Sequence, residues 1–189
     1  MEITFYILAG GKSSRMGEDK GLLLVNDLPM IQHVINAIVP LNCEIIILSN
    51  SDEYEQFNYP VIKDAVASKG PAGGIYTALN HSQTEQNFIV SCDVPNITTE
   101  LIQLIIDAHE NVEVTVPSFD GRLHPIIGVY NKSVLPLFTK AIEENKLKIM
   151  HILEQSKFKE LKLKSDAGWV TKLYFSNVNT MEDLKGLEE

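Results

Sequence analysis

Residues 7–25, ILAGGKSSRMGEDKGLLLV, place a polar, glycine-rich loop directly after an apolar run. That run, ITFYIL at residues 3–8, has the composition of a buried strand, so the loop follows the strand's carboxyl end. Glycine lets backbone N–H groups approach an anion closely and surround its oxygens. Arg15 and Lys20 add cations that can reach a triphosphate. The stretch therefore predicts a phosphate-binding loop in an α/β fold.

Two familiar phosphate-binding loops do not match this spacing. The Walker loop needs glycine, four residues and then Gly-Lys-Ser/Thr, and the dinucleotide loop needs Gly-x-Gly-x-x-Gly. Gly10, Gly11 and Gly17 satisfy neither pattern. The alternative to a phosphate loop is a solvated glycine turn.

The rest of the chain alternates strand-like and helix-like segments. Short apolar runs bounded by turn residues predict strands, and a 3.6-residue apolar period predicts helices. The expected strands are residues 3–8, 43–49, 59–64, 87–93, 112–118, 124–131 and 171–178. The expected helices are residues 29–39, 74–82, 98–110, 133–145 and 148–156, with a short last helix. This alternation predicts a single α/β domain over residues 1–189, with a mostly parallel, doubly wound Rossmann-like sheet and helices on both faces.

Composition narrows the classes of function. The net charge of −9 over 189 residues opposes a broad nucleic-acid surface. Cys43 and Cys92 both lie in apolar segments and provide neither a disulfide framework nor a paired-cysteine zinc site. No apolar run reaches the roughly 20 residues of a membrane span, and the first residues lack a basic secretory start. We therefore expect a cytoplasmic protein with no nucleic-acid or membrane partner.

Asp93 ends the apolar segment NFIVSCD. In a doubly wound sheet, ligands bind outside the carboxyl ends of the strands, where this carboxylate would lie. Mg²⁺ is usually held by one or two protein oxygens together with substrate phosphates, so one aspartate is adequate. Asp93 is therefore a candidate ligand of Mg²⁺ or Mn²⁺. The alternative is an aspartate that caps the turn before Pro95.

The stretch LAGGKSSRMGEDKGLL at residues 8–23 resembles the signature L-A-G-G-x-S-x-R-M-G-x-D-K of the molybdenum cofactor guanylyltransferases. The resemblance continues in order through KGPAGGI, SCDVP, HPIIGVYN and NVNTMEDL, and so covers nearly the whole chain. It implies a nucleotidyltransferase that moves GMP from GTP to the phosphate of a molybdenum–molybdopterin cofactor and releases pyrophosphate. Molybdoenzymes or their chaperones are the further partners that it implies.

The loop chemistry and the resemblance together give three sets of candidate residues. The catalytic candidates are Arg15, Lys20 and Asp93. The nucleotide-binding candidates are Leu8, Ala9, Gly10, Gly11, Lys20, Asn50, Asp64, Gly73 and Asp93. The metal-ligand candidates are Asp93 and Asn179.

Three of these candidates keep a second interpretation. An asparagine of some family members falls on Leu48 here, so Asn50 either replaces it or only shapes a turn. Gly73 lies in a glycine-rich segment that either binds a purine edge or forms a tight strand-to-helix turn. Asn179 either binds the metal or shapes the turn before a helix that Thr180 caps.

Four more residues are candidates for contact with the acceptor. Arg122 and His124 precede the predicted strand at the position of the family's His-Pro pair. Lys146 and Lys148 lie in a segment that is basic in the family and faces the pterin there. The alternatives are a structural histidine and solvated surface lysines.

These candidates predict transfer of a nucleotide to an acceptor phosphate without a covalent enzyme intermediate. The reaction depends on positioning and on charge neutralisation at phosphorus, and backbone amides, Arg15, Lys20 and a metal on Asp93 can supply both. The choice of GTP and of a molybdopterin acceptor comes from the resemblance alone. The alternatives are a cytidylyltransferase of the same architecture and a nucleotide-binding accessory protein without turnover.

Overall fold

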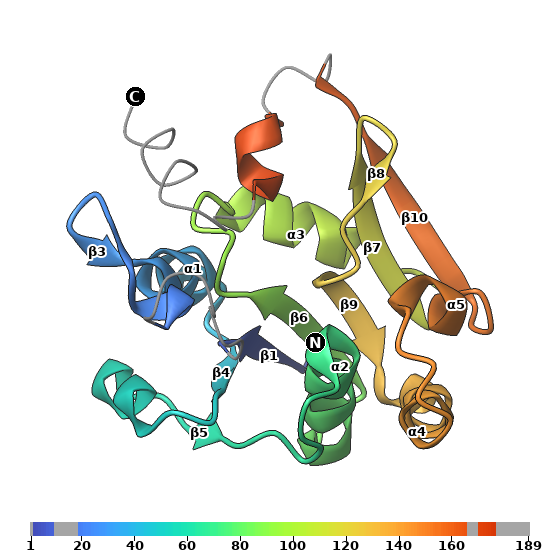
Figure 1. Ribbon diagram of the computed structural model, residues 1–189. Helices are drawn as coiled ribbons and strands as arrows, with labels where there is room; N and C mark the ends of the chain where they lie inside the picture. Colours follow the sequence, from blue (N-terminus) through green and yellow to red (C-terminus); the bar gives the residue numbers. More distant parts are fainter. Residues whose placement is uncertain (1, 10–18, 166–169, 177–189) are drawn as a thin grey trace.

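A computed structural model describes residues 2–9, 19–165 and 170–176 of the chain (Figure 1). The strands of the main sheet are β1 (Ile3–Leu8), β4 (Glu44–Leu48), β5 (Val61–Ile62), β6 (Gln86–Ser91), β7 (Val114–Phe119), β8 (Arg122–Leu123), β9 (Ile127–Asn131) and β10 (Phe158–Leu163). A separate hairpin consists of β2 (Leu24–Val25) and β3 (Leu28–Pro29). The α-helices are α1 (Met30–Ile38), α2 (Gly70–His81), α3 (Thr99–Asp107), α4 (Leu135–Glu143) and α5 (Ile149–Leu153). Short 3-10 helices are η1 (Lys20–Leu22), η2 (Val39–Leu41), η3 (Asp52–Phe57), η4 (Lys132–Val134) and η6 (Lys172–Phe175).

The sheet has the strand order β10-β7-β9-β6-β1-β4-β5, and β8 pairs with β7. The central strand β1 pairs in parallel with both β4 and β6, and β10 pairs in parallel with β7. Strand β9 is antiparallel to both of its neighbours, β6 and β7. The expectation of a mostly parallel sheet is therefore confirmed, with one reversed strand inside it.

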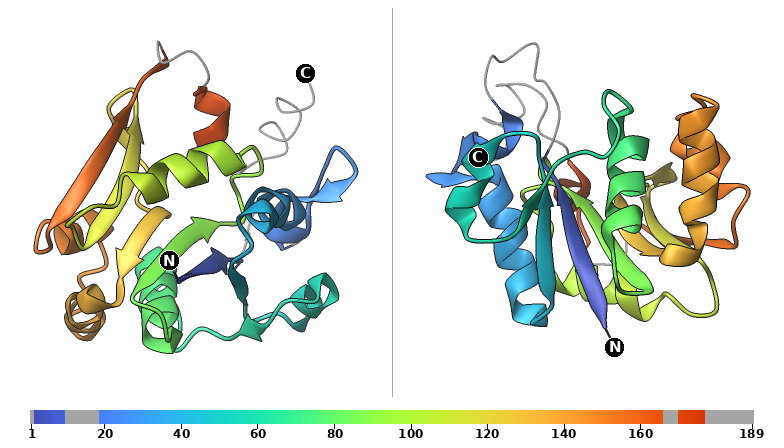
Figure 2. Two further views of the ribbon diagram at one scale, coloured as in Figure 1. Left: turned by 180° about the vertical axis from the view of Figure 1, so that it is seen from behind. Right: turned by 90° about the horizontal axis from the view of Figure 1, so that it is seen from below.

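Strand β1 is buried along its whole length because both faces of the sheet are covered. Its alternate side chains enter different cores: Phe5 and Ile7 face the core under α1 and α3, whereas Tyr6 and Leu8 face the core under α2 and α4. Figure 2 shows α1 and α2 on opposite sides of the sheet in the view from below. Helices thus cover both faces, as the sequence predicts.

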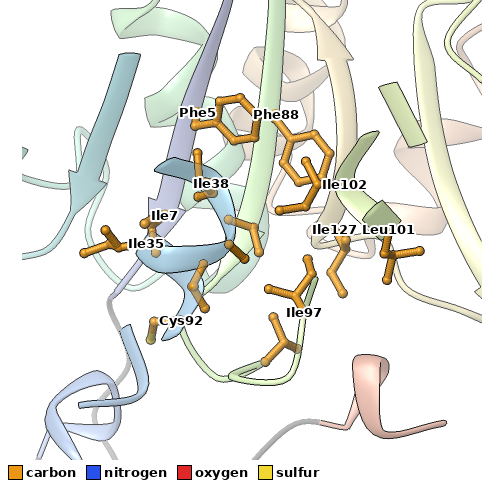
Figure 3. Close-up of a cluster of buried hydrophobic side chains, with 14 of the residues drawn as sticks. Phe5, Ile7, Ile35, Ile38, Phe88, Cys92, Ile97, Leu101, Ile102 and Ile127 are labelled. Carbon is orange, nitrogen blue, oxygen red and sulfur yellow. The ribbon is translucent and has the colours of Figure 1, made fainter. Parts of the chain in front are cut away.

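The core under α1 and α3 is built mainly from isoleucines around a pair of stacked rings (Figure 3). The ring centroids of Phe5 and Phe88 lie 5.0 Å apart on the neighbouring strands β1 and β6. Ile35 and Ile38 of α1 pack against this core, and both are almost fully buried. The core therefore packs α1 against β1 and β6, the two strands that precede the candidate phosphate loop and Asp93.

The strand expected at residues 171–178 was wrong over the part that the structure describes. Lys172–Phe175 forms the 3-10 helix η6, in which Leu173 is half exposed and Phe175 is buried. The Phe175 ring stacks on Phe119, with centroids 5.4 Å apart. The apolar residues of this segment therefore anchor a turn and do not fill a strand position.

Strand β10 was not predicted, because its sequence FKELKL places lysines and a glutamate among the apolar residues. It is an edge strand that pairs only with β7, so one side of it faces solvent and tolerates these charges. Lys159 Nζ donates to the carbonyl of Ala108 at the end of α3, 2.7 Å away. That bond places a cation at the negative end of a helix.

Helix α2 begins at Gly70, four residues before the predicted start at residue 74. The cluster GPAGG therefore forms the first turns of the helix. Gly70 has a φ of +57°, which glycine adopts without steric cost, and Pro71 lies in the first turn, where its missing N–H is tolerated. The predicted threonine cap of α3 is confirmed, because Thr98 Oγ1 accepts the N–H of Leu101 at 3.3 Å. Within the described residues, no helix has the length and apolar character needed to cross a membrane.

His109 joins three elements from a buried position after α3. Its Nδ1 lies 2.9 Å from Thr115 Oγ1, and its Nε2 lies 2.9 Å from Asn131 Oδ1. Burial lowers the pKa of His109 below the usual value for histidine. The folded protein therefore holds this imidazole uncharged at a pH where the unfolded chain binds a proton.

We predict that acid destabilises the fold through His109. A histidine with a lowered folded pKa contributes stability above the unfolded pKa of about 6.5, and this stability is lost as the pH falls below that value. Urea unfolding between pH 7 and pH 5.5 measures the slope. The slope of wild type should exceed that of His109→Gln by up to about 1.4 kcal/mol per pH unit. His151→Gln, which removes an exposed histidine of α5, is the matched control; equal slopes for wild type and His109→Gln would contradict the prediction.

Candidate functional site

The carboxyl ends of three parallel strands meet in one row. In the sheet register, Leu8 of β1 lies opposite Leu48 of β4 and Ser91 of β6. The row continues one step past the strands, because the N–H of Ala9 donates to the Leu48 carbonyl at 2.9 Å and the N–H of Cys92 donates to the Leu8 carbonyl at 3.1 Å. The loops that follow the three strands therefore begin side by side.

A cavity of about 610 Å³ opens at this row. Leu8, Leu48 and Ser91 line it from the sheet, and residues 66–69 with the start of α2 line it from the other side. Ile126, before β9, completes the apolar wall. This volume falls in the range of cavities that bind a small organic molecule.

Asn50 and Asp64 form a reciprocal pair at the mouth of the cavity. Asn50 Nδ2 donates to Asp64 Oδ2 at 2.9 Å, and the N–H of Asp64 donates to Asn50 Oδ1 at 3.2 Å. Both side chains line the cavity. The structure thus brings together two of the predicted nucleotide contacts, which come from the segments after β4 and β5.

Thr77 connects the cavity loop to α2. Its hydroxyl accepts the N–H of Ala65 at 3.0 Å and donates to the carbonyl of Gly73 at 2.9 Å. The side chain is buried, so no water replaces these bonds. One hydroxyl therefore holds the start of the loop at residues 65–69 against the first turn of α2.

The glycines of α2 face different neighbours. A Cβ on Gly74 would lie 3.2 Å from both methyl groups of Leu8, at the cavity wall. A Cβ on Gly73 would lie 2.7 Å from Lys69 Cβ, inside the turn that enters the helix. Gly73, the predicted contact, therefore shapes the approach to the helix, and Gly74 borders the cavity directly.

Asp93 lies two residues beyond Ser91 and is mostly buried. The buried Oδ1 atom of Asp93 has no hydrogen-bond partner within the described residues. Burial raises the pKa of Asp93, while the Ser91 hydrogen bond and the Lys20 charge oppose this rise. An unsatisfied buried carboxylate oxygen is a suitable ligand for a hard divalent cation. Within the described residues, no group of three or more His, Cys, Asp or Glu side chains is placed to hold a metal ion, so substrate phosphates would supply further ligands.

Lys20 begins η1, and Asp19 caps that short helix. Lys20 is close enough to Asp93 for its charge to lower the carboxyl pKa. The structure therefore places the signature lysine and the candidate metal ligand beside each other, although they are far apart in the sequence.

The predicted acceptor contacts lie in two places. His124 is buried, with its ring centroid 4.6 Å from that of Phe175, and Arg122 is exposed on β8. Burial, with a smaller contribution from the positive charge of Arg122, lowers the pKa of His124 to about 4. The imidazole is therefore uncharged at neutral pH and offers no cation to an acceptor phosphate.

Lys146 and Lys148 lie in the exposed connection between α4 and α5. Lys146 pairs with Glu144 at 2.8 Å. Lys69, which lines the cavity, donates to Asn145 Oδ1 at 2.9 Å. The segment that carries Lys146 and Lys148 therefore reaches the rim of the cavity.

Four predicted site residues lie outside the described residues: Gly10, Gly11, Arg15 and Asn179. Sequence reasoning missed the roles of Ser91, Thr77 and Lys69. Ser91 alone had a usable signal, since it precedes Asp93 by two residues and so occupies the same face of the strand end.

A mostly parallel sheet with a ligand-sized cavity at the carboxyl ends of its strands is typical of an α/β nucleotide-binding fold. The MobA-like NTP transferase domain model matches residues 5–160, and the chain belongs to this family. It is therefore a nucleotidyltransferase, and the expected family resemblance is confirmed.

The similar proteins agree with this assignment. A Flavobacterium johnsoniae protein named "Probable molybdenum cofactor guanylyltransferase" is 42% identical over 186 residues, which are 98% of this chain and 96% of that protein. A solved structure of a protein from Aquifex aeolicus superposes with a TM-score of 0.79 at 28% identity and covers 94% of this chain and 93% of its own. The structure of molybdopterin-guanine dinucleotide biosynthesis protein A from Archaeoglobus fulgidus has the same fold, with a TM-score of 0.78 at 20% identity, covering 98% of this chain and 96% of its own.

We predict that Thr77→Val weakens the cavity loop. Valine keeps the shape of threonine but removes the hydroxyl that accepts the N–H of Ala65, at a cost of about 0.5–1.5 kcal/mol in unfolding free energy. Because the loop lines the cavity, nucleotide affinity should fall as well. Denaturant unfolding and calorimetric titration with a nucleoside triphosphate measure the two effects.

Thr139→Val is the matched control for this change. The Thr139 hydroxyl donates to the Leu135 carbonyl at 3.0 Å within α4, which is the same intrahelical bond without a loop partner. Equal losses in the two variants would contradict the role assigned to Thr77.

Proposed function

We propose that this chain transfers GMP from GTP to the phosphate of a molybdenum–molybdopterin cofactor, forming the guanine dinucleotide cofactor and pyrophosphate. The observation that carries the proposal is a nucleoside-sized cavity lined by Ser91, two residues before Asp93, whose buried Oδ1 atom has no hydrogen-bond partner within the described residues. Membership of the family and the printed name of the 42% identical relative support the choice of substrates.

The cavity suits the nucleoside half of GTP. Leu8, Leu48 and Ile126 offer apolar surface to the faces of a base. Asn50 and Asp64 offer an amide and a carboxylate at the mouth, where ribose hydroxyls or a base edge can exchange hydrogen bonds. Backbone groups at residues 8–9 and at the start of α2 add contacts that need no particular side chain.

The phosphates would extend from the cavity past Ser91 towards Lys20 and Asp93. Lys20 would pair with phosphate oxygens through charge-assisted hydrogen bonds. Asp93 would hold a divalent cation, which we propose to be Mg²⁺, by its unsatisfied oxygen. Such an ion supplies charge neutralisation at the triphosphate. The chain's own share of the reaction is then to align the α-phosphorus with the acceptor oxygen and to stabilise the charge that builds there.

The setting of the reaction follows from the same chemistry. Both substrates are soluble phosphorylated compounds, so we place the protein in the cytoplasm. Asn145, the neighbour of Lys146, accepts a hydrogen bond from Lys69 at the cavity lining, and from this segment Lys146 and Lys148 would reach the acceptor phosphate. A molybdoenzyme or its chaperone would take up the product.

Pyrophosphate release tests the proposal. The purified protein is supplied with Mg²⁺, a molybdopterin acceptor and either GTP or CTP. Pyrophosphate release with GTP but not with CTP supports guanylyl transfer. Release with CTP but not with GTP would show that the protein is a cytidylyltransferase instead. Binding of a triphosphate without release would indicate an accessory protein.

We predict that Asp93→Asn abolishes pyrophosphate release and leaves the fold intact. The amide has nearly the same shape as the carboxylate but lacks the charge that holds a divalent cation against the triphosphate. Asp107→Asn, which changes an exposed carboxylate of α3, is the control. Near-normal turnover by a folded Asp93→Asn protein would refute the metal assignment.

We predict that Lys20→Ala weakens GTP binding about tenfold to a hundredfold. The loss corresponds to one charge-assisted hydrogen bond to a bound anion, worth about 1.5–3 kcal/mol. Isothermal titration calorimetry measures the change, with the exposed Lys164→Ala as the control. An unaltered dissociation constant for Lys20→Ala would exclude the contact.

A further inference from the structure

We propose that Tyr54 is a positioning residue for Lys20: its hydroxyl holds Asp19, which in turn orients the short turn that presents Lys20 to the nucleotide. This inference rests on the proposed function, because it assigns the work of Tyr54 to the same triphosphate site. Tyr54 itself does not line the cavity.

Tyr54 is an unusual residue in η3. The helix lies on the surface and is rich in acidic residues, yet Tyr54 is fully buried, with 0% of its side chain exposed. Phe57 of the same helix packs beside it, with ring centroids 6.1 Å apart. A buried phenol needs a hydrogen-bond partner, and this partner comes from a distant part of the chain.

The partner is Asp19, which is 35 residues earlier in the sequence. The Tyr54 hydroxyl donates to Asp19 Oδ1, and the N–H of Gly21 donates to the same oxygen at 3.2 Å. Burial raises the pKa of Tyr54 well above its usual range, so the phenol stays protonated and remains a donor. Asp19 Oδ1 thus accepts two hydrogen bonds, and Lys20 lies in the chain between Asp19 and Gly21, the two residues that one of these bonds joins.

Gly21 completes the contact. A Cβ on Gly21 would lie 2.4 Å from the Tyr54 hydroxyl oxygen and 3.1 Å from Cys92 Sγ, so only glycine fits. Cys92 lies at one end of the isoleucine-rich core (Figure 3) and is followed by Asp93. The turn that carries Lys20 is therefore clamped between a buried tyrosine and the strand end that carries Asp93.

This arrangement gives the hydroxyl a role that the ring alone does not have. The ring fills space in the core, and phenylalanine would fill it equally well. The hydroxyl fixes the carboxylate of Asp19, which caps η1 and so sets the direction in which Lys20 leaves the backbone. Removing the hydroxyl should leave the core packed and let Lys20 move away from its phosphate partner.

A double-mutant cycle tests the proposal. GTP dissociation constants are measured by calorimetry for wild type, Tyr54→Phe, Lys20→Ala and the double variant, with circular dichroism as the control for folding. Tyr54→Phe should weaken binding about fivefold to thirtyfold, the effect of losing one or two kcal/mol. In the Lys20→Ala background, the same change should alter affinity by less than about twofold, because the residues act through one contact.

Two further variants sharpen the test. Tyr6→Phe removes a buried hydroxyl that bonds to His81 Nδ1 at 3.0 Å, in a part of β1 away from the site, and should leave GTP affinity unchanged. Gly21→Ala should displace the Tyr54 hydroxyl and weaken binding as Tyr54→Phe does, and the two losses should not add. If Tyr54→Phe is poorly stable, the positioning role is still supported when Gly21→Ala weakens GTP binding and Tyr6→Phe does not.

Three results would overturn the inference. Unchanged affinity in folded Tyr54→Phe, with weakened affinity in Lys20→Ala, would overturn it and leave the proposed function standing. An effect of Tyr54→Phe that is equally large with and without Lys20 would show that Tyr54 acts only through general stability. Failure of wild type to bind GTP would overturn the proposed function and this inference with it.

Discussion

The parallel register of β1 between β4 and β6 is the constraint on which the site depends. It places Leu8 opposite both Leu48 and Ser91, and backbone bonds from Ala9 and Cys92 extend the alignment beyond the strands. A slip of one residue in either pairing would turn every side chain of that strand to the other face of the sheet. Leu8 would then leave the cavity wall for the opposite core, and the segment that carries Ser91 and Asp93 would no longer begin beside Leu8. The two buried faces of β1 make such a slip costly, because both of its side-chain rows are packed.

The electrostatics of the site depend on the same alignment. If an acidic protein with a net charge of −9 binds a triphosphate as proposed, the attraction must come from a few cations close to the carboxyl ends of the strands. Asp93 adds a negative charge there, which is useful only when a cation covers it. Burial already raises its pKa, and Lys20 opposes that rise. In the proposed function, a divalent cation between this carboxylate and a substrate phosphate would offset the negative charge of both.

The sequence predicts the elements whose residues alternate or repeat in a regular way. Strands β1, β4 and β6 are apolar on both sides, and α1 and α3 have clear helical periods, so local pattern is sufficient for them. Strand β10 was missed because an edge strand needs only one apolar side. The expected strand at residues 171–178 was wrong because Phe175 satisfies its burial from a short helical turn. The apolar pattern of a single segment does not show which strand or helix it packs against, or whether it lies at the edge of the sheet.

The candidate site likewise contains residues that the sequence predicts and contacts between them that it does not. Asp64 and Asn50 were both candidates, but their mutual pairing depends on where the segments after β4 and β5 meet, which no local pattern encodes. The Thr77 bridge is similar, since a threonine in the middle of a helix normally bonds only within its own helix. Motif residues were found because their chemistry is unusual for their position. The groups that hold them are ordinary residue types, and only the folded chain gives them a role.

The charged edge strand has a consequence for the protein in a crowded solution. Within the part of the chain that the structure describes, β10 pairs with a strand on one side only, and an open sheet edge is a template for the addition of a strand from another molecule. Lys162 and Lys164 are exposed along this edge. A second copy approaching in register would bring its own lysines against them and would have to desolvate both sets. At the opposite edge, β5 is only two residues long and offers little backbone to pair with. The two edge strands, β10 and β5, thus disfavour edge-to-edge addition of further copies. The interior strands, which are among the most apolar segments of the chain, stay covered.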